Sequence, residues 1–179
     1  EVYPLISPWI FKRARRAGAA TVLTCHDYRL SCPALFHFRD GGVCFECDSG
    51  GVWSCVNNTC CGSLAKSVVY AARNTWASAW RLYSYVDRFL VPSAFAQNIL
   101  IQHACLNAAS IRVLFNPVAR PSKDVPFEEG DYVAYVGRVS QEKGVEPLLH
   151  AMEGLNIPLH MAGSIPSPMI SKGEASFVH

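Results

Sequence analysis

The stretch that decides the fold is Tyr132–Gly163, YVAYVGRVSQEKGVEPLLHAMEGLNIPLHMAG. Its first residues form a short apolar, aromatic and β-branched run, which predicts a buried strand that ends at Gly137. Apolar residues then recur at helical spacing on one face, with Pro147 in the first turn, where its missing N–H costs nothing. The run Leu159–Ala162 predicts a second strand. A strand–helix–strand unit of this size predicts a parallel sheet with a right-handed crossover, and therefore an α/β fold.

The loop between the predicted strand and helix carries two cations, Arg138 and Lys143. Cations beside a helix N-terminus suit an anionic phosphate group, because backbone N–H groups and the helix dipole add to the side-chain charges. The loop from Gly137 to Gly144 matches neither the dinucleotide fingerprint G-x-G-x-x-G nor the P-loop G-x-x-x-x-G-K-[ST]. From the residues alone, two interpretations therefore stay open: a phosphate site and a solvated loop.

Composition limits the classes of function. The chain has 179 residues, half of them apolar, which is enough for one domain and part of a second. A net charge of +2 makes no case for nucleic acid. No apolar run approaches the roughly 18 residues of a membrane span, and no signal-peptide pattern opens the chain. We expect a cytoplasmic protein. The basic cluster Lys12, Arg13, Arg15 and Arg16 predicts either a solvated helix face or peripheral contact with the inner face of an anionic membrane.

A second candidate site follows the segment 19–25 (AATVLTC), which predicts a strand with His26 and Asp27 directly at its carboxyl end. Ligands of open α/β sheets collect beyond the carboxyl ends of the strands. His26 could orient or deprotonate a bound hydroxyl, and Asp27 could hold the imidazole in one tautomer or itself accept a hydrogen bond. The alternative is that the pair only caps the turn.

Residues 32–61 lose periodicity and predict a cysteine-rich insertion. A Cys-x-x-Cys pair, Cys44 and Cys47, is followed by Cys55 and Cys60, so that four thiolates could complete a tetrahedral site, with Cys32 as the reserve ligand. We predict a structural zinc ion here. Unligated thiols or a disulfide, and an iron–sulfur cluster, are the alternatives.

The rest of the chain predicts further α/β structure. Ser63 and Ser93 are candidate N-caps of two helices, and 87–91 and 111–114 are candidate strands. One apolar side of the first of these helices is predicted to face the core: Leu64, Val68, Ala72, Trp76, Trp80 and Tyr83. Prolines and charges predict a linker at 119–130. It would separate a partial domain, 1–118, from the start of a second one, 131–166, and residues 167–179 stay unassigned.

Several motifs together resemble glycosyltransferase family 4. The sequence GRVSQEKGVEPLLHAM (137–152) is similar to the start of that family's second domain, G-R-x-x-x-E-K-G before a Leu-rich helix. The sequence HDYRLSCP (26–33) is similar to the HDYRLxCP of a bacterial subgroup that shares the cysteine pattern through Cys60. DRFLVPSAF (87–95), IRVLFNPV (111–118) and MAG (161–163) follow in the family's order. The resemblance covers about Tyr3 to Pro166.

The resemblance implies a GT-B fold, with two Rossmann-like domains that are both incomplete here. The first would bind a glycan or lipid-linked acceptor and the second a nucleotide-diphosphate sugar. Arg138 and Lys143, with Gly137 and Gly163, would hold the donor diphosphate, whose growing negative charge fixed cations stabilise without a catalytic cofactor. His26, with Asp27 beside it, would lie near the transferred sugar. The implied reaction is retaining hexosyl transfer in polysaccharide or cell-envelope biosynthesis.

Two features of the family are missing: its pair of Glu separated by seven residues and its N-terminal glycine-rich acceptor loop. We therefore expect the chain to be a fragment, truncated at both ends, that is inactive by itself. Two other functions compete with the transferase. One is a zinc-stapled α/β binding module whose insertion docks a partner, and the other is a nucleotide-binding regulatory protein without catalysis.

Overall fold

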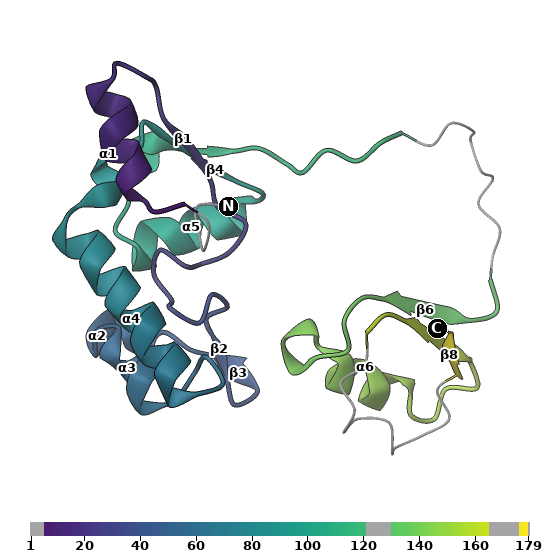
Figure 1. The fold of residues 1–179 in the computed structure, drawn as a ribbon. Helices are drawn as coiled ribbons and strands as arrows, with labels where there is room; N and C mark the ends of the chain where they lie inside the picture. Colours follow the sequence, from purple (N-terminus) through teal and green to yellow (C-terminus); the bar gives the residue numbers. More distant parts are fainter. Residues whose placement is uncertain (1–5, 121–129, 165–175, 179) are drawn as a thin grey trace. The chain divides into compact units, whose positions relative to one another are not determined.

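The computed structural model describes residues 6–120, 130–164 and 176–178, and the chain divides into two compact units, Glu1–Val118 and Ala119–His179 (Figure 1). Each unit contains a parallel sheet with helices, so the predicted α/β class is confirmed. Most of the predicted linker, at 121–129, and most of the unassigned tail, at 165–175 and 179, lie outside the described residues.

The first unit is built on a parallel sheet of β1 (Val22–Thr24), β4 (Arg88–Val91) and β5 (Ile111–Val113), in the order β1-β4-β5. Helix α5 (Ala94–His103) packs against β4 and β5, and α1 (Trp9–Arg16) contacts the short 3-10 helix η1 (Leu82–Tyr85). A second 3-10 helix, η2 (Ala108–Ser110), precedes β5. Apolar side chains from these elements share one core: Phe11, Cys25, Val86, Phe89, Val91, Ala96, Leu100 and Ile111.

One carboxylate fixes the start of β1 beside the start of β4. The backbone N–H of the buried Thr21 donates to Asp87 Oδ2 at 2.8 Å, and the Thr21 hydroxyl lies 2.9 Å from the same oxygen. Arg15 of α1 forms an ion pair with the other oxygen of Asp87. These contacts set the register of β1, and therefore the position of the two residues that follow its carboxyl end.

Both predicted serine caps are confirmed. The hydroxyl of Ser63 accepts a hydrogen bond from the Lys66 N–H at 3.3 Å and begins α4 (Leu64–Ala79). The hydroxyl of Ser93 accepts from the Ala96 N–H at 3.1 Å and begins α5. Each side chain satisfies an amide that the first turn of a helix leaves without a partner.

The predicted core side of α4 is wrong for five of its six residues, whereas the sixth, Tyr83, lies in η1 and packs against the core of the first unit. The buried residues of the helix are small or polar, Ser67, Ala71, Asn74 and Ala77, whereas Leu64, Val68, Ala72, Trp76 and Trp80 are exposed. Small side chains let this helix approach its neighbours closely. The Asn74 amide is satisfied there, because its Nδ2 donates to the Arg29 carbonyl at 3.0 Å.

The cysteine-rich insertion folds as a short hairpin and two short helices beside α4 (Figure 1). The hairpin pairs β2 (Phe38–Arg39) with β3 (Gly42–Val43), and the helices are α2 (Glu46–Ser49) and α3 (Trp53–Asn57). Within the insertion, Arg39 forms an ion pair with Glu46. The insertion meets α5 at His103, on which the Phe45 ring stacks with centroids 3.9 Å apart and whose Nδ1 is hydrogen-bonded to Asp48. The insertion is therefore attached to the first unit by packing and by polar contacts.

The second unit confirms the predicted strand–helix–strand order. It contains β6 (Val133–Val136), the 3-10 helix η3 (Gln141–Lys143), α6 (Val145–Met152) and β7 (Leu159–Ala162). The strand β8 (Ser176–Val178) adds to β7, so all neighbours in the order β6-β7-β8 are parallel. Four buried residues form its core: Val139, Val145, Leu159 and Met161.

Strand β6 is buried on one side only. Val133 and Tyr135 pack against the core of the second unit, whereas Val136 is 84 % exposed, so the prediction of a fully buried strand is half right. Within the described ranges, no helix has the length and apolar character needed to cross a bilayer.

Candidate functional site

His26 and Asp27 lie where predicted, directly beyond the carboxyl end of β1. The Cys25 N–H still pairs with the Leu90 carbonyl of β4 at 2.8 Å, and the chain then leaves the sheet. The His26 side chain is exposed and Asp27 is half-buried. Both residues line a cavity of about 450 Å³ whose other walls come from α1, β1, η1, the residue Ile6 before α1 and the turn after β1: Ile6, Ile10, Phe11, Val22, Leu23, Thr24, Cys25, Arg29, Leu30 and Tyr83. The exposed imidazole is thus available to a bound molecule.

The described contacts of Asp27 run to Arg29. Arg29 donates from Nε to Oδ1 at 2.8 Å, from Nη2 to Oδ2 at 2.5 Å, and from its backbone N–H to Oδ1 at 3.0 Å. Of the two roles predicted for Asp27, this geometry corresponds to the hydrogen-bond acceptor. Burial pushes the pKa of Asp27 upward, but the Arg29 hydrogen bonds and the charges of Arg29 and Arg73 bring that pKa below its usual value. The carboxylate is therefore ionised at neutral pH.

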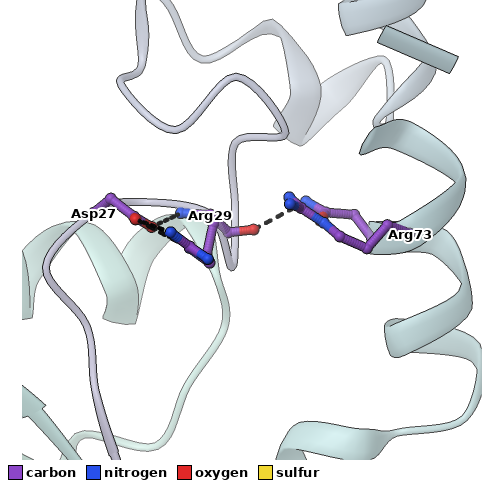
Figure 2. A network of polar contacts seen from close by, with 4 residues as sticks. Asp27, Arg29 and Arg73 are labelled. Carbon is purple, nitrogen blue, oxygen red and sulfur yellow. Dashed lines mark hydrogen bonds and ion pairs between the residues drawn. The ribbon is translucent and has the colours of Figure 1, made fainter. Parts of the chain in front are cut away.

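A polar network connects this turn to α4 (Figure 2). The Arg29 carbonyl accepts from Asn74, and Asn74 Oδ1 accepts from Arg73 Nε at 3.0 Å and Nη2 at 2.9 Å. No sequence pattern predicted a role for Arg29 or Arg73 in this network. The contact of Arg29 could have been predicted, because an Arg two residues after an Asp in a turn can reach its carboxylate. Arg73 is far from the turn in the sequence, so no local pattern links the two.

In the second unit, the loops after β6 and β7 lie against each other. The Gly137 N–H donates to the Ala162 carbonyl at 2.9 Å, and the Val139 N–H donates to the Ser164 carbonyl at 3.0 Å. Gly163 has φ +148°, and a Cβ there would lie 2.7 Å from the carbonyl carbon of Gly137. This position therefore requires glycine because another backbone approaches it closely.

Arg138 and Lys143 lie in the same loop and act on one carboxylate. Arg138 Nη2 is 3.6 Å from Glu142 Oε1, and both cations help to hold the pKa of Glu142 below its usual value. The largest cause of that shift is the hydroxyl of Ser140, although its geometry falls short of a regular hydrogen bond. Arg138 and Lys143 are both exposed. An anion that bound here would compete with Glu142 for Arg138.

The cysteines of the insertion lie near one another as free thiols. Burial raises the pKa of Cys47 to about 11, and the neighbouring Cys32, Cys60 and Cys44 add to that rise. Cys55 is almost fully buried, and its Sγ is 3.7 Å from Cys61 Sγ, well beyond the roughly 2.05 Å of a disulfide bond. Burial also raises the pKa of Cys32, although the nearby backbone N–H groups of 34–37 offset part of that rise.

The donor atoms of this cluster suit zinc, since thiolates are its usual structural ligands. In the part of the chain that the structure describes, however, no three His, Cys, Asp or Glu side chains are arranged to hold one metal ion. The described geometry thus brings the predicted ligands into one region without forming a complete coordination site, and the zinc ion stays a prediction.

Comparison of the chain with protein-family models, with curated proteins and with solved structures finds no match in any of the three.

Proposed function

We propose that the protein is a glycosyltransferase of the family 4 type, which moves a sugar from a nucleotide-diphosphate sugar to a glycan or lipid-linked acceptor. In this proposal the two α/β units correspond to the Rossmann-like domains of a GT-B enzyme. The observation that supports it best is the loop of the second unit, in which Arg138 and Lys143 stand at the carboxyl edge of two parallel strands, beside two closely approaching glycine backbones.

The carboxyl edge of a parallel sheet is where α/β proteins bind nucleotides. Gly163 lets the Gly137 backbone approach closely, so the loops after β6 and β7 lie together at this edge, beside Arg138. Arg138 and Lys143 would then supply positive charge to the phosphates. In sugar transfer the nucleoside diphosphate is the leaving group, and its negative charge grows in the transition state. Fixed cations at this position would stabilise that charge more strongly than in the ground state.

The first unit would supply the acceptor side. His26 borders the cavity of about 450 Å³ and is exposed, so its imidazole can orient an acceptor or sugar hydroxyl, or take its proton. Asp27 would act indirectly, because its carboxylate is engaged by Arg29 and fixes the turn that carries His26. Retention at the anomeric carbon is part of the proposal on the sequence resemblance alone.

Binding of nucleoside diphosphates tests this proposal. Calorimetric titration with UDP, GDP and ADP should show binding of at least one, and the double change Arg138→Ala and Lys143→Ala should abolish it. Charge-assisted hydrogen bonds contribute about 1.5–3 kcal/mol each, so each single change should weaken binding by roughly tenfold or more.

Arg112→Ala is the matched control, because Arg112 is an exposed cation on β5 of the first unit. It should leave the titration unchanged. If the double variant and the wild type bind the nucleoside diphosphate with equal affinity, the proposed diphosphate site at Arg138 and Lys143 is wrong.

A further inference from the structure

The exposed side of α4 is apolar along its length. At 100° per residue, six positions fall within an arc of about 100° opposite the buried residues: Ala65, Val68, Val69, Ala72, Trp76 and Ala79. Their side chains are exposed, with Val69 at 64 % and Trp76 at 40 %. Helices of globular proteins normally turn such an arc toward a core, whereas the side chains of this arc remain exposed within the described part of the chain.

Helix α1 extends this arc with a tryptophan and with positive charge. The Trp9 ring stacks on Trp76 with centroids 6.0 Å apart and meets the edge of Trp80 at 5.4 Å. Lys12 Nζ lies 4.6 Å from the Trp9 ring centroid and 5.6 Å from that of Trp80. Helical spacing places Arg13 and Arg16 on the same side of α1 as Trp9, and both are exposed. We call this set, with the arc of α4, the tryptophan surface.

The charge of the tryptophan surface has one sign. Helices α1 and α4 contain six of the sixteen Lys and Arg residues of the chain and none of its fourteen Asp and Glu residues. They carry +6 in a chain whose net charge is +2. Asp87 engages Arg15, on another side of α1, which leaves the charges beside Trp9 for a partner.

We infer that the tryptophan surface binds the headgroup region of an anionic lipid bilayer. Tryptophan prefers the boundary between headgroups and acyl chains, where its ring is apolar and its N–H stays hydrated. Val68 and Val69 would enter that boundary, and Lys12, Arg13 and Arg16 would contact lipid phosphates. A nucleic-acid site would use cations and aromatic rings as well, but it would not place aliphatic side chains at its centre.

This binding does not depend on sugar transfer, although a lipid-linked acceptor would make it useful. Sedimentation of the protein with phosphatidylglycerol–phosphatidylcholine vesicles should show bound protein. With phosphatidylcholine vesicles alone, affinity should fall by about tenfold or more, as expected for several cations near a charged surface. Tryptophan fluorescence should shift to shorter wavelength on binding.

The paired changes Val68→Glu and Val69→Glu should abolish sedimentation, and Arg13→Glu with Arg16→Glu should remove the preference for anionic vesicles. Phe95→Glu is the control, because Phe95 is an exposed aromatic on α5 and should tolerate the change without loss of binding. Circular dichroism checks that each variant is folded. The inference is wrong if the wild-type protein does not sediment with the vesicles. It is also wrong if the surface instead forms a concentration-dependent dimer that the valine changes disrupt, or if the protein binds an oligonucleotide instead of vesicles. Titration with nucleoside diphosphate is performed without lipid, so the two proposals can fail separately.

Discussion

The sequence predicts where single residues of the two candidate sites lie more reliably than it predicts the contacts that their side chains make. His26 and Asp27 were predicted at the carboxyl end of a strand, and they lie there. The bonds from Arg29 to Asp27 were not predicted, because the sequence does not show that a side chain two residues away folds back on the turn. Rotamers of this kind depend on the three-dimensional path of the loop, which hydrophobic periodicity does not report.

Gly163 gives a prediction at this scale. Gly163→Ala should destabilise the second unit by at least about 1–3 kcal/mol, because a side chain is strained at φ +148° and meets the Gly137 backbone. Gly130→Ala is the control, since a Cβ there would come no closer than 4.0 Å to its nearest neighbour. Urea unfolding of both variants measures the difference, and equal stabilities would contradict the close approach.

The ion pair of Asp27 and Arg29 predicts a pH dependence. The pKa of Asp27 is depressed in the folded protein, so its carboxylate contributes stability above its ordinary pKa of about 3.9 and loses that contribution as the pH falls through the folded value. Arg29→Met should therefore lower the free energy of unfolding by about 1–3 kcal/mol at pH 7. The difference from wild type should shrink below about pH 4.

Arg112→Met serves as the control for that series, since it removes a cation that has no described contact with Asp27. Urea unfolding from pH 7 to pH 3 gives the profile. A deficit of the Arg29 variant that stayed constant across this range would show that packing, rather than the ion pair, is responsible.

Among the elements, helix starts were predictable and helix faces were not. Ser63 and Ser93 predict the starts of α4 and α5, because N-capping is a local interaction that the sequence shows directly. The face of α4 was predicted wrongly because apolar spacing shows that a helix has an apolar side, but not what covers it. The buried side includes Ser67, Ala71 and Asn74. These residues are buried because small side chains allow close packing and because Asn74 donates a hydrogen bond to the Arg29 carbonyl, which is distant in the sequence.

The cysteine-rich insertion carries its own prediction. We propose that Cys44, Cys47, Cys55 and Cys60 bind one structural zinc ion after a local rearrangement, since thiolates would have to converge and lose their protons. Metal analysis of the purified protein should find one zinc ion per chain, and a chelator should lower the melting temperature. Cys47→Ser should lose the metal, whereas the exposed Cys105→Ser should keep it. Protein without zinc or iron, with four freely titratable thiols, would rule this out.

At the scale of the whole molecule, sequence patterns were enough for the α/β class and for the strand–helix–strand unit at Val133–Ala162. They did not predict that β8 would extend the second sheet, because residues 176–178 carry no distinguishing pattern in so short a segment. The basic residues of the tryptophan surface were named from the sequence, but its aromatic and aliphatic part was missed for a related reason. Its residues come from α1 and α4, and only the fold brings Trp9 to Trp76, which is 67 positions further along the chain.

The central claim is that the loops after β6 and β7 bind the diphosphate of a nucleotide sugar. The most direct measurement is amide NMR of the labelled protein during titration with a nucleoside diphosphate and, separately, with the matching nucleoside. The diphosphate should shift the amide signals of 137–144 and of Gly163, and the nucleoside, which lacks phosphate, should leave most of them in place. Signals of these residues that stay unchanged with every nucleoside diphosphate, or that move equally with the nucleoside alone, would contradict the claim.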